Sequence, residues 1–355
     1  MIFFTQSPAS PQRLSSVDFA SLWRHYHEAK FLYPAKLKRI QTVLSGIQQG
    51  WSALMDAPPD IFQLHIAGAA GRIFSSVCAF RDTPDTFVVQ HAVSNGQPLH
   101  MIDCLQSVTS GISACVEAKS GCMFFRLENR WPLRLMQSVG EHYSPEQVDL
   151  RTQDYLVCRG VRKSCISAVQ DFEDTVPPEV AAFALETLGE LRARSLGLIS
   201  GDRAFEDLRD RYAQLHLTRD RCIFGSFRDG RLVGIALCYI TGFPMNFSLL
   251  CGRAELLVRR DAPDRAAVVS ELASAAIHHA NSRGERLLPA LLDPADSDSA
   301  IAAGFEATGK QYSNFLWPRE EGRGFASTAI AFSHWYGRIE RAVAIERTSP
   351  RNAAS

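Results

Sequence analysis

Hydrophobic positions in the first third of the chain change from a helical to a strand-like spacing. Over residues 17–55, apolar side chains recur every three to four positions, and Pro34 suits the first turn of a second helix. Three runs rich in β-branched and aromatic residues then follow between turn signals: IFQLHIA (61–67), RIFSSVCAF (72–80) and TFVVQHAV (86–93). We therefore predict two helices followed by an antiparallel meander of three strands.

The remainder of each half follows one common order. In the first half the pattern predicts helix 99–112, strand 122–128, helix 131–140 and strand 154–166. The second half repeats the sequence of elements with helices 179–197 and 202–217, a hairpin 221–240, strand 252–260, helix 262–284, strand 286–293 and a short helix and closing strand within 299–317.

This repeated order predicts an α/β fold. A meander that passes into a β-α-β step gives a mixed central sheet flanked by helices on both faces. The chain has 355 residues and 46% hydrophobic content, enough for two cores. We expect an N-terminal domain over 1–153, a C-terminal domain over 154–320, and a C-terminal helix and tail over 321–355, through which a homodimer could form.

Charge and cysteine content narrow the classes of function. Lys plus Arg and Asp plus Glu both total 38, so net charge gives no reason to expect nucleic acid or an anionic membrane as partner. The nine cysteines form no CxxC pair, which favours reduced, buried thiols and no metal site. We find neither a signal peptide nor a membrane-spanning run, and we expect a cytoplasmic protein.

Several segments resemble the GCN5-related N-acetyltransferase (GNAT) superfamily. In the second half they are GSFRDGRLVGIALCYI (225–240), AELLVRRD (254–261) and AIAAGFEATGKQYSNFLW (300–317). The first half matches less closely, through GRIFSSVCAF (71–80) and TFVVQHAVS (86–94). The resemblance implies two tandem GNAT-like domains that use acetyl-CoA or another acyl-CoA as donor and a small amine as acceptor.

The resemblance also implies where the donor pyrophosphate would bind: the turn after the fourth strand of each unit, where backbone N–H groups at a helix start face the anion. The candidates are Val258, Arg259, Arg260, Arg265 and Ala266 in the second half, and Asn95, Gly96 and Gln97 in the first. The second-half turn lacks glycine and contains Pro263, so its arginines would have to compensate.

Three residues are candidates for proton transfer. By resemblance, Glu255 occupies the place of a carboxylate base on the fourth strand. The usual tyrosine acid is replaced by Ala300, and Tyr312 lies nearby in sequence. In the first half, His91 is a candidate base because imidazole titrates near neutral pH.

Two functions remain open at this point. The first is an acyl-CoA-dependent N-acyltransferase. The second is a catalytically degenerate GNAT-like module that recognises a nucleotide, another small ligand or a protein partner. A basic run, Arg159 to Lys163, lies between the two halves and is a further candidate for binding a phosphate.

Overall fold

The structure is a computed structural model. It describes residues 2–5, 17–69, 72–95, 98–144, 147–160, 169–201, 203–242, 245–322 and 324. Gly96, Gln97 and the expected C-terminal helix with its homodimer contact lie outside these residues. Within the described part of the chain, no helix is both long enough and apolar enough to cross a membrane.

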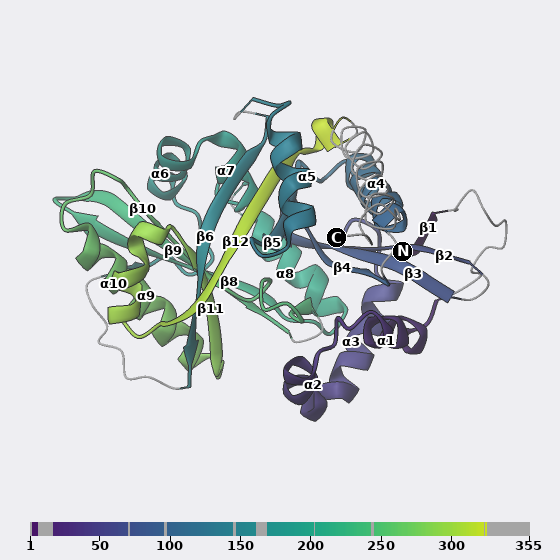
Figure 1. Ribbon diagram of the computed structural model, residues 1–355. Helices are drawn as coiled ribbons and strands as arrows, with labels where there is room; N and C mark the ends of the chain where they lie inside the picture. The colour runs from purple at the N-terminus through teal and green to yellow at the C-terminus, as the bar shows by residue number, and fades with distance from the viewer. Residues whose placement is uncertain are drawn as a thin grey trace, which may run out of the picture.

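Twelve strands of the described chain form one mixed sheet (Figure 1). Their bounds are β1 Ile2–Thr5, β2 Phe62–Ala69, β3 Arg72–Thr83, β4 Thr86–Ser94, β5 Ser120–Arg126, β6 Asp149–Arg159, β7 Val169–Asp171, β8 Arg219–Arg228, β9 Arg231–Thr241, β10 Ala254–Val258, β11 Leu287–Leu292 and β12 Glu306–Pro318.

The helices are α1 Phe19–Glu28, α2 Pro34–Ile40, α3 Leu44–Asp56, α4 Pro98–Ala114, α5 Arg130–Gly140, α6 Pro178–Leu188, α7 Glu190–Ser195, α8 Ala204–Gln214, α9 Arg265–Ser282 and α10 Ser297–Ala302. Local chemistry sets several of these boundaries. Asp18 caps α1 by accepting a hydrogen bond from the Ser21 N–H at 2.8 Å, and Pro34 begins α2. Gly189, at φ +80°, divides the predicted helix 179–197 into α6 and α7.

The mixed α/β fold class is confirmed, and the two halves repeat one strand pattern. In the first half, β2, β3 and β4 form an antiparallel meander and β5 is parallel to β4. In the second half, β8, β9 and β10 form the meander and β11 is parallel to β10. The crossover helices are α4 and α9, as the β-α-β pattern predicts.

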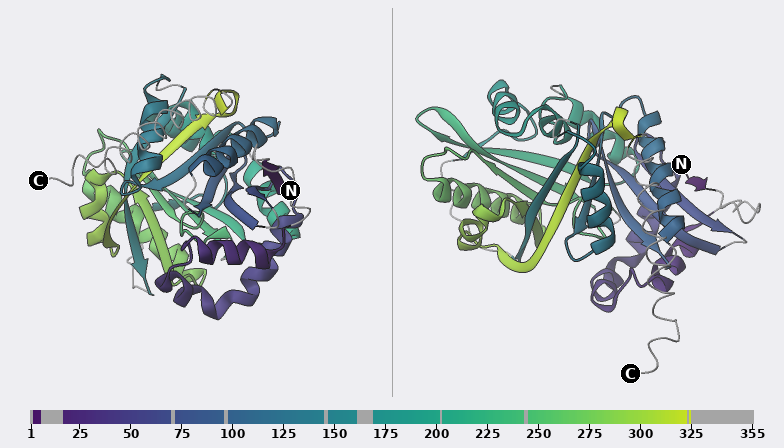
Figure 2. Two further views of the ribbon diagram at one scale, coloured as in Figure 1. Left: turned by 45° about the vertical axis from the view of Figure 1, so that its right-hand side comes forward. Right: turned by 45° about the horizontal axis from the view of Figure 1, so that its top comes forward.

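The last strand of each half pairs with the other half. The sheet order is β1-β2-β3-β4-β5-β12-β6-β11-β10-β9-β8-β7. Strand β6 therefore pairs with β11, β12 pairs with β5, and the two pair with each other. Figure 2 shows β6 and β12 between the two sets of strands. The predicted boundary at 153/154 falls within β6, and the division into two domains stays a prediction.

Alternating side chains give the sheet two covered faces. Helices α4, α5, α9 and α10 cover one face, which we call the α4 face. Helices α1–α3 and α6–α8 cover the opposite face, the α1 face. Between these helices, a smaller cluster on the α1 face joins the halves and includes Phe124, Tyr155 and Tyr312. In Figure 1, α4 and α1–α3 lie on opposite sides of the first-half strands.

Candidate functional site

The cavity that contains the predicted site residues His91 and Tyr312 lies where β4 and β5 separate. Their parallel pairing covers only Thr86–Val89 and Ser120–Met123, although β4 continues to Ser94 and β5 to Arg126. A cavity of about 1040 Å³ occupies this position and continues across β12 and β6. Its volume suits a ligand of cofactor size.

The two ends of this cavity differ in chemistry. On the α4 face it is lined by apolar side chains, among them Met101 and Leu105 of α4, Met123 and Phe125 of β5, and Met136 of α5. We call this the apolar throat. On the α1 face the lining is aromatic and basic, and we call this end the basic chamber; its cations are Lys30, Lys36, Arg39, Arg126, Arg159 and Lys310.

Strand alternation explains why three of these cations face the chamber. Arg126 lies two residues after Phe124, Lys310 two before Tyr312, and Arg159 two after Val157. Phe124, Tyr312 and Val157 all belong to the cluster on the α1 face. Since side chains two apart on a strand share a face, the three cations point the same way.

His91 projects into the cavity from a β-bulge. The pairing of β3 with β4 slips between Ser76 and Cys78, and His91 has a left-handed φ of +52°. Such strain in a non-glycine residue is found mainly at functional sites. The imidazole is 3% exposed among the rings of Trp51, Phe80 and Phe247, and neither ring nitrogen has a hydrogen-bond partner. Burial, followed by the charge of Lys36, lowers the pKa of His91 to about 3.

Lys36 is the most buried cation of the chamber. It is 6% exposed, and its Nζ lies 3.5 Å from the centroid of the Phe31 ring. Burial is the main cause that lowers the pKa of Lys36 to about 7, and repulsion from Arg39 and Arg126 adds to it. At neutral pH, the Lys36 amine is therefore uncharged in a substantial fraction of the molecules.

Tyr312 lines the cavity on the α1 face, the side of the basic chamber. Its hydroxyl accepts a hydrogen bond from Arg126 Nε at 3.1 Å, and its ring lies 5.1 Å from that of Tyr155 between centroids. The sequence-predicted Tyr312 and His91 thus line one cavity.

A segment of the second half closes the chamber. Phe247, Ser248, Leu249 and Leu250, which connect β9 to β10, line the cavity. Arg39 of α2 donates from Nη2 to the Phe247 carbonyl oxygen at 2.9 Å. The cavity of the first half is therefore completed by residues of the second half.

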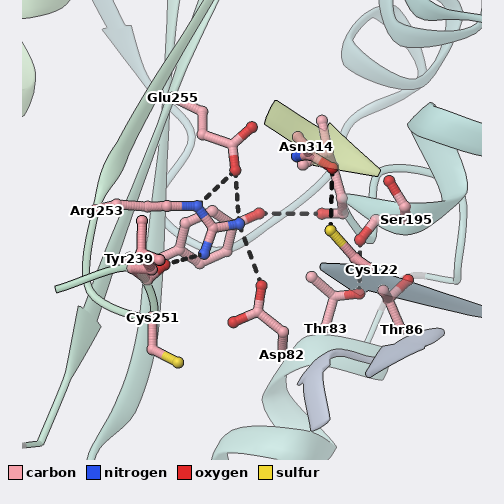
Figure 3. A network of polar contacts seen from close by, with 12 residues as sticks. Asp82, Thr83, Thr86, Cys122, Ser195, Tyr239, Cys251, Arg253, Glu255 and Asn314 are labelled. Carbon is pink, nitrogen blue, oxygen red and sulfur yellow. Dashed lines mark hydrogen bonds and ion pairs between the residues drawn. The ribbon is translucent and has the colours of Figure 1, made fainter. Parts of the chain in front are cut away.

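Glu255 lies elsewhere, in a buried ion-pair network (Figure 3). It is 1% exposed, and its Oε1 accepts from Arg253 Nε at 2.7 Å. Arg253 Nη2 lies 3.2 Å from Asp82 Oδ2, and Arg219 Nη2 donates to Asp82 Oδ1 at 2.7 Å. Two cations and two carboxylates thus balance each other. Glu255 is not among the residues that line the cavity, so the structure does not bring it together with His91 and Tyr312.

Two arginines among the second-half donor candidates, Arg259 and Arg265, are held by contacts within the protein. Arg259 forms a bidentate ion pair with Glu186. Arg265 holds both oxygens of Asp296 at 2.7 and 2.8 Å and donates to the carbonyl of Arg259 at 2.8 Å. Val258 is buried in the core under α9, whereas Arg260 and Ala266 are exposed.

In the first half, the strand that precedes the corresponding turn reaches the cavity. Ser94, the last residue of β4, lines it. Asn95 N–H donates to the Phe74 carbonyl at 3.0 Å, while the buried Asn95 Oδ1 has no hydrogen-bond partner. Gly96 and Gln97 lie outside the described residues, and the turn leads directly into α4.

Sequence reasoning missed most of the chamber. Lys36 and Arg39 are three apart on α2, a spacing that places them on one helix face without indicating a ligand. Arg126, Lys310 and Tyr155 come from three different strands, and only the exchanged order of β5, β12 and β6 brings them together. Arg159 belongs to the basic run between the two halves, which the sequence offers as a candidate phosphate site.

Comparisons with known proteins find likeness in solved structures alone. No protein-family model matches the chain, and no curated protein sequence matches it. A tandem GNAT protein from the clavulanic acid biosynthesis pathway is 16% identical, with a TM-score of 0.41 over 77% of this chain and 88% of its own. A GCN5-related N-acetyltransferase from Sphaerobacter thermophilus is 14% identical, with a TM-score of 0.39 over 70% and 78%. A GCN5-related N-acetyltransferase-like protein from Streptococcus suis 89/1591 is 11% identical, with a TM-score of 0.40 over 76% and 92%. All three of these solved structures are GNAT proteins or GNAT-like proteins by their names, and one of them is a tandem protein.

Proposed function

We propose that this protein is an N-acyltransferase that takes an acyl-CoA donor in the cavity between β4 and β5 of its first half. The observation that carries this proposal is the separation of two parallel strands beside a strained bulge, with a cavity that passes through the sheet. A long, thin donor needs such a passage, because its reactive end must meet the acceptor on the far side.

The residues present suit a pantetheine-bearing donor at this place. The apolar throat accommodates an aliphatic arm, and the unpaired amide oxygen of Gln90, which lines the cavity, is available to an amide N–H group of the donor. The pyrophosphate would bind at the start of α4, where N–H groups are free of helical partners. Bound there, the thioester would supply an activated acyl group.

The second half fits a donor less well. Its crossover helix α9 packs directly on the ends of β10 and β11, with Val258, Val268, Leu272 and Leu288 in one apolar cluster. Arg259 and Arg265 already hold Glu186 and Asp296. We therefore assign the second half a supporting role, in which it supplies the Phe247–Leu250 wall of the cavity.

Lys36 is the proton acceptor that the site favours. An amine must lose a proton before it attacks, and an ideal base has a pKa near the working pH. The pKa of Lys36 is near 7, whereas that of His91 is about 3, so His91 binds a proton too weakly. Tyr312 would donate a proton to the departing thiolate, with Arg126 holding its hydroxyl oxygen in place.

Calorimetry and a thiol assay together test this function. Acetyl-CoA at 100 times its Kd should stabilise the fold by roughly 2.7 kcal/mol. Free CoA thiol should then appear only when an acceptor amine is added. Absence of both heat and stabilisation at millimolar acetyl-CoA would reject the proposal and favour a binding module for another ligand.

A further inference from the structure

We propose that the acceptor of this protein carries an anionic group, a carboxylate or a phosphate, and that Arg126 of the basic chamber binds it. The inference rests on the proposed function and specifies its acceptor. It follows from the charges that line the chamber, from the burial of one of them, and from the face of the sheet on which they lie.

The lining of the cavity is one-sided in charge. Six basic side chains, those of Lys30, Lys36, Arg39, Arg126, Arg159 and Lys310, line it. No Asp or Glu is among the described residues of the lining. Arg159 reaches a carboxylate, Glu306, at 2.5 Å, yet within the described part of the chain neither Lys36 nor Arg126 forms an ion pair.

This imbalance stands out because most buried arginines elsewhere in the described chain are paired with a carboxylate. The chain as a whole has equal numbers of acidic and basic residues. Most buried arginines outside the chamber hold a carboxylate, as in the pairs Arg192–Asp149, Arg219–Asp82 and Arg221–Asp174. Arg81 instead donates to backbone carbonyl oxygens. A buried cation without a counter-ion is costly, and the lowered pKa of Lys36 reflects that cost. A bound anion would supply the missing counter-ion.

Lys36 gives a second, independent indication of an anion. Its side chain is more than nine-tenths buried, lines the chamber and has aromatic rings rather than carboxylates beside it. Arg39 and Arg126 lie close enough to repel its charge. An anion bound between these groups would relieve that repulsion, because opposite charges in a partly buried site attract more strongly than in water.

The position of the cations assigns them to the acceptor rather than to the donor. All of them lie on the α1 face of the sheet, on the helix α2 that covers it, or, for Lys30, in the turn between α1 and α2. The start of α4, where the donor pyrophosphate would bind, is reached from the apolar throat on the opposite face. A cationic acceptor, such as a polyamine, would be repelled by the chamber, whereas an amine with a carboxylate or phosphate would be attracted.

Titration calorimetry with two simple anions tests the proposal. Inorganic phosphate and acetate are titrated separately, at constant ionic strength set with chloride, into the protein without CoA and saturated with CoA. The variants are Arg126→Gln, Arg126→Lys, which retains charge, and Arg203→Gln, which removes an exposed arginine of the second half paired with Glu206.

We expect at least one anion to bind both with and without CoA. Binding should weaken at least tenfold in Arg126→Gln, be partly retained in Arg126→Lys and be unchanged in Arg203→Gln. Preference for phosphate or for acetate indicates which group the acceptor carries. Binding of neither anion, or equal binding by the wild type and Arg126→Gln, would overturn the proposal.

The titrations in the presence of CoA distinguish a failure of the anionic-acceptor proposal from a failure of the proposed function. If the anion is lost when CoA binds, the chamber holds the phosphates of the donor, and the acceptor assignment is wrong although a CoA site exists. If CoA gives no heat, the proposed function has failed, while anion binding by Arg126 is still measured in its absence.

Discussion

Arg253 of the second half and Asp82 of the first form a buried ion pair, with 3.2 Å between Nη2 and Oδ2. The same guanidinium binds Glu255 and donates from Nη1 to the carbonyl of Leu250 at 2.7 Å. Burial alone would lower the pKa of Arg253, but Asp82 and Glu255 hold it well above its ordinary value. This arginine therefore links both halves to the segment that closes the cavity.

Replacing Asp82 with Asn should strongly destabilise the protein. The change leaves Arg219 and Arg253 with one carboxylate fewer in a site that is almost fully buried. Removing one partner of a buried pair typically costs about 3–5 kcal/mol. Urea unfolding of the wild type and of Asp82→Asn measures this loss in the free energy of unfolding. The exposed pair of Arg203 and Glu206 provides the control, since Glu206→Gln should cost under about 1 kcal/mol.

Replacing Glu255 with Gln should change stability more than catalysis. The carboxylate balances Arg253 in the core, so its loss should cost roughly 3–5 kcal/mol while the folded fraction keeps its turnover rate. As a general base, Glu255 would instead contribute roughly 10²–10⁴-fold to the rate. Glu186→Gln, which removes an exposed partner of Arg259, is the matched control. A large loss of rate with unchanged urea midpoint would restore Glu255 as the base.

Lys36 should give the stability of the protein a distinct pH dependence. Its pKa is about 7 in the folded state and near 10.5 when unfolded, so between these values the unfolded chain binds the extra proton. The free energy of unfolding should therefore rise with pH across this window, by up to about 1.4 kcal/mol per unit from this residue. Lys36→Met should remove that slope, and the exposed Lys38→Met should not. If the free energy of unfolding changed with pH in the same way in the wild type and in Lys36→Met, a buried Lys36 amine with a lowered pKa would be contradicted.

Tyr312→Phe should reduce acyl transfer while leaving the fold intact. The hydroxyl contacts Arg126 at the cavity, and the ring that packs on Tyr155 is retained. Loss of a proton donor typically lowers a rate by roughly 10²–10⁴-fold. Tyr143 does not line the cavity, so Tyr143→Phe serves as control. An unchanged kcat in Tyr312→Phe would remove this tyrosine from the reaction.

The order of elements could be predicted from the sequence because it depends on local signals. The hairpin β8–β9 illustrates this: Asp229 and Gly230 have φ values of +50° and +75°, as an Asp-Gly hairpin turn requires. Helix α9 likewise ends before Gly284, as predicted.

The exchange of β6 and β12 could not be predicted in this way. Both are strands of alternating pattern, and the sequence does not encode which distant edge each of them joins. The basic chamber depends on that exchange, since Arg126, Lys310 and Arg159 come from neighbouring strands β5, β12 and β6. The position of Glu255 on its strand makes it a candidate base. Its ion-pair network, however, depends on Asp82, which lies 173 positions earlier in the chain and is brought close only by the tertiary fold.

The most direct test of the account is the affinity for acetyl-CoA of two tryptophan variants. Ala92 is exposed at the bulge of β4 and lines the cavity, so Ala92→Trp would obstruct it. Ala266, exposed in the first turn of α9, is the equivalent obstruction in the second half. We expect calorimetry to show at least tenfold weaker binding in Ala92→Trp and unchanged binding in Ala266→Trp. The reverse, with binding lost only in Ala266→Trp, would place the donor in the second half and contradict the account.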